Sequence, residues 1–541
     1  MMITTRAAAW SAALLASLGA PAMAARAPNE NQNRAHLDRY VEAARADWRN
    51  VGVALVVVQG DAVVYLKGFG LRQIGKPETV DADTLFQIGS TSKAIAAAAL
   101  GVLVDADKVR WDDPVVDYWP QLQLGDPWLT RNITVRDTVT HRSGIQESPY
   151  FVFSVMSAEQ AMRQLRYITP EAAFRDSYRY SNLLYGVAGE VAAAVSGMSW
   201  NEFVKQRLLQ PLQMKRSGAS PYEFWDARFV TPTFQGSAAE GRPNSSDARD
   251  ANVAMPHVLD ANGTATVLAW QSYDNAAAAG SIVSCASDMA NWLRMNLNEG
   301  RLGERQILST ATVRELHATQ NLRTDESRDQ FPLEGPAEGY AMGWIRSHYQ
   351  GQLHLAHSGG ILGFPAYVAL LPERRIGVAV LSNSPNLIGD SQAFNKAIAF
   401  RALDQQLGGP LRDWSQAFLA KSQSAHEAAR SSEEKMQQSR LLNAPPSLPL
   451  DQYVGDYEDR QLHSGPISIR LENGRLALRF AGAGAFSGVL EPWHHDVFRL
   501  HPANRAGPGG YPSFGLDASG KVTSFVAFNA TFERLPAKQL P

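Results

Sequence analysis

The sequence is poor in cysteine, in net charge and in long apolar runs. Cys285 is the single cysteine among 541 residues, so an intrachain disulfide is excluded and stability must come from burial. The formal net charge of −2 excludes the strong basic field with which many proteins attract nucleic acid. After the first residues, no run reaches the roughly 18 uninterrupted apolar residues of a membrane span. We therefore expect a globular chain of about two to four domains, with no nucleic-acid partner and no membrane span.

The first residues have the pattern of an export signal. Arg6 precedes an apolar run from Ala7 to Ala20, and the small residues of Pro21-Ala22-Met23-Ala24 follow. This order predicts a signal peptide over residues 1–24, although a buried N-terminal helix is an alternative. A twin arginine and a lipid-anchor cysteine are both absent from this segment. We expect export to the periplasm or the medium, and a disordered polar segment over residues 25–35.

Residues suited to hold a metal or a cofactor are also scarce. His141 and His354 have no partner at metal-ligand spacing, and a lone cysteine excludes thiolate ligand sets. The glycine-rich segment 507–510 lacks the strand-then-helix context of a phosphate-binding loop. Cys285 lies at a predicted strand-to-helix junction, where we expect a buried structural thiol. The sequence therefore predicts no metal and no cofactor.

Changes in periodicity divide the rest of the chain. Helical and strand-like runs alternate from residue 36 to residue 409, which predicts one main domain. Over residues 410–446 apolar residues thin out and Gln, Ser, Glu and Lys dominate, so we expect a partly helical linker. Over residues 447–541 apolar residues recur at every second position, as in a β-strand. Asn473-Gly474 separates two such alternating runs, which is a strong hairpin signal. We predict a barrel-like antiparallel β domain there.

Ser90 and Lys93 stand at the beginning of an alanine-rich helical segment. Residues three apart lie on one helical face, so Lys93 would point the same way as Ser90, one turn further on. A hydroxyl at a helix N-terminus beside an amine is a plausible activated nucleophile. Alone, however, Ser-x-x-Lys is also compatible with a helix N-cap serine and a solvated lysine.

Two further segments supply the remaining parts of such a site. Tyr180-Ser181-Asn182 precedes an apolar helix. An ammonium close to a phenol favours the phenolate, so Tyr180 beside Lys93 could take the proton of Ser90 and return it to the leaving group. Asn182 carries both a donor and an acceptor, so it could orient Lys93 and a substrate amide. His357-Ser358-Gly359-Gly360 follows a strand, and its glycines would let a substrate backbone approach. The N–H groups of Ser90 and Gly360 would then form an oxyanion hole. Each segment alone is also compatible with a turn or a loop.

In this order, the three segments resemble the serine β-lactamase and penicillin-binding-protein superfamily, in its class C branch. That branch has the motifs S-x-x-K, Y-x-N and K-T-G or H-x-G. They read here as Ser90 to Lys93, Tyr180 to Asn182 and His357 to Gly359. Residues 86–89, 133–144 and 280–292 add to the likeness, which extends over about 36–405. Residues 453–457 resemble the opening of the lipocalin-like domain that many of these hydrolases carry.

The resemblance implies an α+β fold of the class C β-lactamase and DD-peptidase kind, with an antiparallel sheet flanked by helices and an all-helical lobe. It also implies an acyl-enzyme on Ser90, formed without a metal. Lys93 and Tyr180 would share the acid–base work, and the sequence leaves open which is the base. Asn182, His357, Ser358, Gly359 and Gly360 would bind the substrate.

The third motif departs from that of β-lactamases, which carry a lysine where this chain has His357. A lysine is a cation near neutral pH, whereas a histidine is largely neutral. We therefore predict a hydrolase that acts on a peptide or amide containing a D-amino acid, or on an ester. Arg142 or Arg179 could supply the missing charge, so a β-lactamase is one alternative. A non-catalytic protein that binds peptidoglycan or another partner is a second. The oligomeric state is not predicted.

Overall fold

The computed structural model describes residues 30–147, 156–232, 247–259, 264–323, 339–385, 390–459, 467–480, 486–503, 509–528 and 530–536. The predicted signal peptide lies outside these ranges. Helix α1 extends from Glu30 to Trp48. The prediction of disorder was therefore wrong for residues 30–35, because this polar stretch forms the first turns of a helix. The apolar side of that helix, at Leu37, Val41 and Ala44, is buried.

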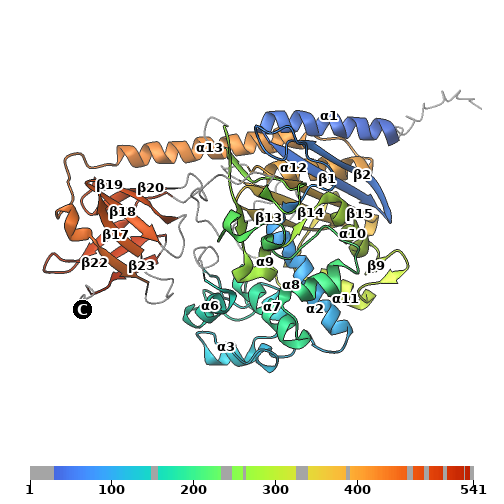
Figure 1. The fold of residues 1–541 in the computed structure, drawn as a ribbon, viewed down its shortest axis with the longest axis horizontal. Helices are drawn as coiled ribbons and strands as arrows, with labels where there is room; N and C mark the ends of the chain where they lie inside the picture. Colours follow the sequence, from blue (N-terminus) through green and yellow to red (C-terminus); the bar gives the residue numbers. More distant parts are fainter. Residues whose placement is uncertain are drawn as a thin grey trace, which may run out of the picture.

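The centre of the main domain is a seven-stranded antiparallel sheet, in the order β11-β12-β13-β14-β15-β1-β2 (Figure 1). Its N-terminal hairpin pairs with the later strands through β1 and β15. The strands are β1 (Gly52–Gln59), β2 (Ala62–Gly70), β11 (Gly339–Tyr340), β12 (Ile345–Tyr349), β13 (Gln352–Ile361), β14 (Phe364–Leu371) and β15 (Ile376–Ser382). β1 and β2 are consecutive antiparallel strands and form this hairpin.

Helices cover both faces of this sheet. On β1, alternate residues face opposite sides: Val53, Leu55 and Val57 belong to one apolar cluster and Ala54, Val56 and Val58 to the other. The first cluster includes α1 and α12 (Ala393–Leu407), and the second includes α2 (Ser92–Asp105) and α10 (Ala286–Leu297). Burial on both faces explains why β1 is an unbroken apolar run.

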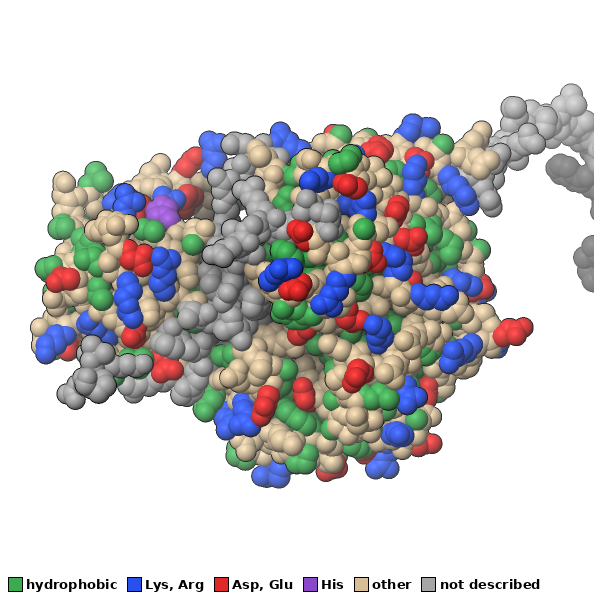
Figure 2. Space-filling model, in the orientation of Figure 1, with side chains coloured by type: hydrophobic (Ala, Val, Ile, Leu, Met, Phe, Trp, Pro, Cys, Tyr) green, Lys and Arg blue, Asp and Glu red, His purple; other side chains and the backbone are tan. Residues whose placement is uncertain are grey.

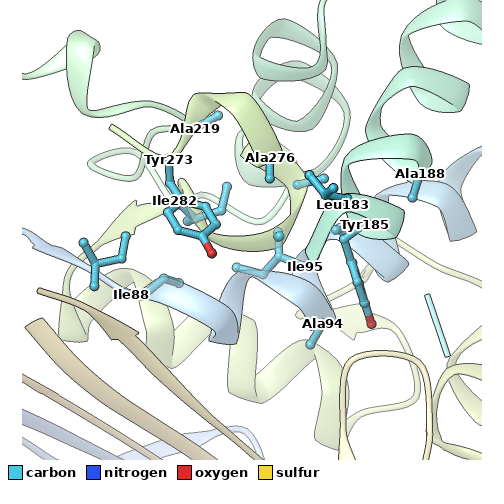
Figure 3. Packing of buried hydrophobic residues seen from close by; sticks show 14 of the residues in the cluster. Ile88, Ala94, Ile95, Leu183, Tyr185, Ala188, Ala219, Tyr273, Ala276 and Ile282 are labelled. Carbon is cyan, nitrogen blue, oxygen red and sulfur yellow. The ribbon is translucent and has the colours of Figure 1, made fainter. Parts of the chain in front are cut away.

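The helical lobe lies below the sheet in Figure 1. Its helices are α3 (Pro127–Asn132), α4 (Val135–Thr138), α6 (Ala158–Arg163), α7 (Asn182–Ser196), α8 (Trp200–Val204), α9 (Ala277–Gly280) and α11 (Thr310–His317). Short strand pairs flank it: β3 (Phe86–Gln87) with β8 (Val283–Ser284), β4 (Val230–Pro232) with β7 (Trp270–Ser272), β5 (His257–Leu259) with β6 (Ala265–Val267), and β9 (Arg301–Leu302) with β10 (Arg305–Gln306). Figure 3 shows Ile95 of α2 beside Leu183 and Tyr185 of α7.

Cys285 is buried between β8 and α10, as predicted for a structural thiol at a strand-to-helix junction.

A 25-residue helix, α13 (Trp414–Gln438), occupies most of the predicted linker. Trp414 and Phe418 near its beginning are buried against Phe400 of α12. Near its end, Glu433 accepts a hydrogen bond from Tyr511 and forms an ion pair with Arg499. The helix therefore contacts the main domain at one end and the C-terminal domain at the other (Figure 1).

The C-terminal domain is a closed eight-stranded antiparallel barrel. Its strands are β16 (Gly455–Glu458), β17 (Ile467–Glu472), β18 (Arg475–Phe480), β19 (Gly488–His494), β20 (Val497–Pro502), β21 (Ser513–Leu516), β22 (Val522–Ala527) and β23 (Ala530–Arg534). Asn473 and Gly474 form the predicted β17–β18 turn, with φ values of 50° and 74°. Aromatic rings fill the interior, including Tyr453, Tyr457, Phe498, Phe514, Phe525 and Phe532.

The surface agrees with the small net charge. Figure 2 shows acidic and basic side chains interspersed over the visible face. In the described part of the chain, no helix combines the length and apolar character needed to span a bilayer.

Candidate active site

Ser90 lies in a 3₁₀ turn, Gly89–Thr91, that leads directly into α2. The N-cap position of α2 is Thr91, and Ser90 does not cap either helix. The alternative of a capping serine is therefore wrong. Lys93 is also not a solvated lysine, since its side chain is completely buried. The turn brings the two side chains together at the beginning of the helix.

Lys93 has three hydrogen-bond acceptors around its amine. Nζ donates to Ser90 Oγ at 3.1 Å, to Asn182 Oδ1 at 2.7 Å and to the carbonyl oxygen of Ala279 at 3.0 Å. Burial lowers the pKa of Lys93 to about 7, while the charge of Glu147 acts in the opposite direction. The amine therefore exists near neutral pH in both protonation states, in hydrogen-bond contact with the serine hydroxyl.

Tyr180 completes the contacts of the serine hydroxyl. Tyr180 OH donates to Ser90 Oγ at 2.8 Å, and Lys93 Nζ lies 4.7 Å from the centroid of the phenol ring. Burial raises the pKa of Tyr180 well above its ordinary value. The sequence predicts a phenolate favoured by the nearby ammonium, but the cost of burying an anion is the larger effect. Tyr180 is therefore a neutral phenol in this site.

The third motif lies on β13, with His357 turned toward the interior. Its Nε2 is 3.1 Å from Tyr340 OH, and its Nδ1 is 2.6 Å from the carbonyl oxygen of Ser358. Burial, together with the charge of Lys93, lowers the pKa of His357 to about 3. The imidazole is neutral at physiological pH, as the sequence predicts.

The two arginines considered as replacements for the missing lysine are both engaged elsewhere. Arg142 Nε donates to the buried carboxylate of Asp137 at 2.6 Å. Arg179 donates to the carbonyl oxygen of Tyr178 and forms an ion pair with Glu171.

The serine turn and β13 are in backbone contact. A Cβ on Gly359 would lie 2.0 Å from the carbonyl oxygen of Ile88, and a Cβ on Gly89 would lie 2.5 Å from Gly360 N. Only glycine permits this approach, and Gly89 also has a positive φ of 51°. In the described residues β12 pairs with β13 only up to Ala356. Among the described residues, no strand pairs with this edge of β13 from residue 357 to residue 361, beside the serine, and we call it the open edge.

Two buried side chains from one loop were missed as site residues. Glu147 Oε1 accepts a hydrogen bond from Asn182 N at 2.5 Å, and burial raises the pKa of its carboxyl. His141 Nδ1 accepts one from Ser181 N at 3.1 Å. The sequence indicated a role for them only through their position, since both are polar residues in or close to residues 133–144, which add to the family resemblance. The eight predicted site residues lie on the serine turn, in the first turn of α2, at the start of α7 or on β13.

Comparisons with known proteins give a match for each of the two domains. A family model described as Beta-lactamase matches residues 37–403, and one described as a domain of unknown function (DUF3471) matches residues 439–538. An unguisins hydrolase of Aspergillus violaceofuscus is 27% identical over 78% of this chain and 74% of its own length. The D-alanyl-D-alanine-carboxypeptidase/endopeptidase AmpH of Escherichia coli is 23% identical over 64% of this chain and 84% of its own.

Solved structures show the same fold. An octameric penicillin-binding protein homologue from Pyrococcus abyssi superposes with a TM-score of 0.58 and 22% identity, over 92% of this chain and 99% of that one. The D-amino acid amidase of Ochrobactrum anthropi SV3, in complex with D-phenylalanine, has a TM-score of 0.52 and 20% identity, over 69% of this chain and 98% of that one.

Proposed function

The chain belongs to the beta-lactamase family of serine hydrolases, and from this premise we propose that it cleaves amide or ester bonds through an acyl-enzyme on Ser90. The observation that carries the proposal is the position of Ser90 Oγ between Lys93 Nζ at 3.1 Å and Tyr180 OH at 2.8 Å. A nucleophile with a base and a proton donor in hydrogen-bond reach is the arrangement that acyl transfer needs.

In the proposed acylation, Lys93 is the base and Tyr180 the acid. Neutral Lys93 takes the proton from Ser90 while Oγ forms a bond to the substrate carbonyl carbon. The C–N or C–O bond then breaks, and Tyr180 gives its proton to the leaving group. Lys93 returns a proton to Tyr180 through the hydrogen bonds around Ser90. Water then hydrolyses the ester by the same steps in reverse. The lowered pKa of Lys93 and the raised pKa of Tyr180 support this division of roles.

We assign substrate binding to the open edge of β13 and to Asn182. A substrate backbone would lie along residues 357–361, with its carbonyl oxygen near the N–H groups of Ser90 and Gly360. Such donors stabilise the oxyanion, and the loss of one typically costs ~3–4 kcal/mol. Asn182 would contact the substrate amide while its Oδ1 holds Lys93.

The preferred substrates are peptides or amides that contain a D-amino acid, and esters. The neutral His357 provides no cation for a carboxylate beside the reacting bond. Among the similar proteins are an unguisins hydrolase, a D-alanyl-D-alanine carboxypeptidase and a D-amino acid amidase, and their names favour amide cleavage. β-Lactam hydrolysis is the second candidate because of the family. We also propose that residues 1–24 direct export, which N-terminal sequencing of the mature protein would test.

A fluorophosphonate probe tests the nucleophile. We expect the wild type to be labelled and Ser90→Ala to remain unlabelled. An unlabelled wild type, beside a labelled relative, would favour a non-catalytic binding protein. Labelling of Ser90→Ala would show that another residue is the nucleophile.

Substrate class is tested on the same preparation with a chromogenic cephalosporin, D-amino-acid amides and short acyl esters. We expect amide or ester turnover to exceed cephalosporin turnover. The reverse order would overturn the interpretation of His357.

A further inference from the structure

His141 is a buried residue with no role in the proposed reaction. Its side chain is fully buried, and its backbone has a positive φ of 54°, which is uncommon outside glycine. Its carbonyl oxygen accepts hydrogen bonds from Arg179 N at 2.8 Å and from Asn321 Nδ2 at 2.9 Å. The backbone is therefore fixed in a conformation that holds the imidazole ring in one place.

The imidazole touches the segment that carries Tyr180 in two ways. Nδ1 accepts a hydrogen bond from Ser181 N at 3.1 Å. The ring also lies against the ring of Tyr180, with centroids 4.3 Å apart and planes inclined by 34°. One side chain thus contacts both the proton donor and the peptide unit that follows it.

The protonation state fits this geometry. An N–H donates to Nδ1, so Nδ1 carries no proton and the neutral ring has its hydrogen on Nε2. Burial lowers the pKa of His141 well below its ordinary value, and the charge of Lys93 acts in the same direction. The acceptor at Nδ1 is therefore present throughout the pH range in which Lys93 titrates.

We propose that His141 is a positioning residue: by accepting the Ser181 N–H and packing against the Tyr180 ring, it aims the Tyr180 hydroxyl at Ser90 for proton transfer to the leaving group. The inference rests on the proposed function, since it needs Tyr180 to act as the acid. A displacement of about 1 Å at a reacting group can lower a rate by ~100-fold. A small shift of Tyr180 would therefore be measurable.

The leaving group distinguishes positioning from general stability. p-Nitroaniline can leave only when its nitrogen is protonated, whereas p-nitrophenol is acidic enough to leave as the anion. A loss of proton donation by Tyr180 should therefore slow an anilide more than the matching ester. We define the discrimination ratio as kcat/KM for the p-nitroanilide divided by kcat/KM for the p-nitrophenyl ester of the same acyl group.

His141→Phe keeps an aromatic ring against Tyr180 but removes the acceptor for Ser181 N. His141→Asn removes the ring but keeps an acceptor atom bonded to Cγ, as Nδ1 is in histidine. Asparagine also tolerates a positive φ. His354→Phe is the matched control, because His354 is another buried histidine packed against aromatic rings, on the opposite side of the sheet from the serine. Circular dichroism and thermal denaturation establish that each variant is folded.

We expect the discrimination ratio to fall by about 10- to 100-fold in His141→Phe, by about 3- to 10-fold in His141→Asn, and to stay within twofold of wild type in His354→Phe. An unchanged ratio in a folded His141 variant would overturn the inference, even if both rates fell. An equal fall in His354→Phe would also overturn it. Absence of phosphonate labelling in the wild type would instead reject the proposed function, so the two failures are distinguishable.

Discussion

The rate of acylation should follow the ionisation of Lys93. Burial lowers the pKa of this lysine to about 7, and only the neutral amine can take the proton of Ser90. Since kcat/KM reports the ionisation of the free enzyme, it should rise tenfold per pH unit below about pH 7 and level off above it. At about pH 5 roughly 1% of Lys93 is neutral, so kcat/KM should be ~100-fold below the plateau.

Glu147→Gln is the perturbation that isolates the electrostatic part of this effect. The charge of Glu147 raises the pKa of Lys93, in opposition to burial. Glutamine keeps an oxygen for the hydrogen bond from Asn182 N but carries no charge. The inflection of the pH profile should therefore move to lower pH, and the variant should retain a larger share of its own plateau rate in acid.

The assay is the second-order rate of fluorophosphonate labelling of Ser90, measured from about pH 5 to about pH 9. The attack of Ser90 is then observed alone, as phosphonylation with loss of fluoride, without the hydrolysis of an acyl-enzyme. A profile that is flat over this range, or that is still rising tenfold per unit at its upper end, would refute Lys93 as the base. The second result would point to a solvated lysine or to the phenol of Tyr180, since both have ordinary pKa values of about 10. An inflection that moves upward in Glu147→Gln would refute the electrostatic argument.

Three further predictions concern the acid, the buried ion pairs and the barrel. Tyr180→Phe should lower kcat/KM for anilides by about 10²- to 10⁴-fold with the fold intact, because only the hydroxyl at 2.8 Å from Ser90 is lost; a wild-type rate would exclude Tyr180 as the acid. Asp137→Asn should lower the free energy of unfolding by about 3–5 kcal/mol, measured by denaturant titration, because it removes a fully buried carboxylate and leaves Arg142, whose side chain is 16% exposed, without its charged partner. Burial by itself would raise the pKa of Asp137, but hydrogen bonds and ion pairs with arginines lower it. The contribution of Asp137 to the free energy of unfolding should therefore be complete above about pH 4, and it should be lost as the pH falls through the pKa of Asp137 in the folded protein. Phe514→Ala should lower the free energy of unfolding of the barrel by about 3–5 kcal/mol, since Phe514 packs among the interior rings. A change below about 1 kcal/mol would mean that the interior relaxes around the cavity.

The positions of the motifs could be predicted because each lies where a local pattern changes. Ser90 begins an alanine-rich helix, Asn182 begins a second apolar helix, and His357 lies where the residues of a strand become glycines. The Asn473-Gly474 turn could be predicted for the same reason, since its φ values depend on two neighbouring residues alone. The N-terminal boundary was missed over residues 30–35, because a polar stretch without its own apolar periodicity shows no sign of continuing a helix.

The protonation states could not be predicted from sequence, because they depend on burial by residues distant along the chain. From Tyr180 and Lys93 as a pair, the phenolate was the natural expectation. In the fold Lys93 has no exposed surface, and the loss of water acts on both groups against the charged form. At neutral pH the neutral amine is therefore available as a proton acceptor, and the phenol keeps its proton and is available as a donor.

Loop residues 141–147 show the same dependence on distant contacts. His141 and Glu147 accept hydrogen bonds from consecutive backbone N–H groups, those of Ser181 and Asn182, which lie 40 and 35 residues further along the chain. Neither contact follows from spacing or periodicity, since hydrogen bonds between loops have no repeat. Both acceptors are buried and titratable, so protonation of His141 Nδ1 would break the hydrogen bond from Ser181 N, and neutralisation of Glu147 would remove a charge beside Lys93. Two side chains of one loop thus act on the site in different ways, His141 on the position of Tyr180 and Glu147 on the pKa of Lys93, and their variants separate the two effects.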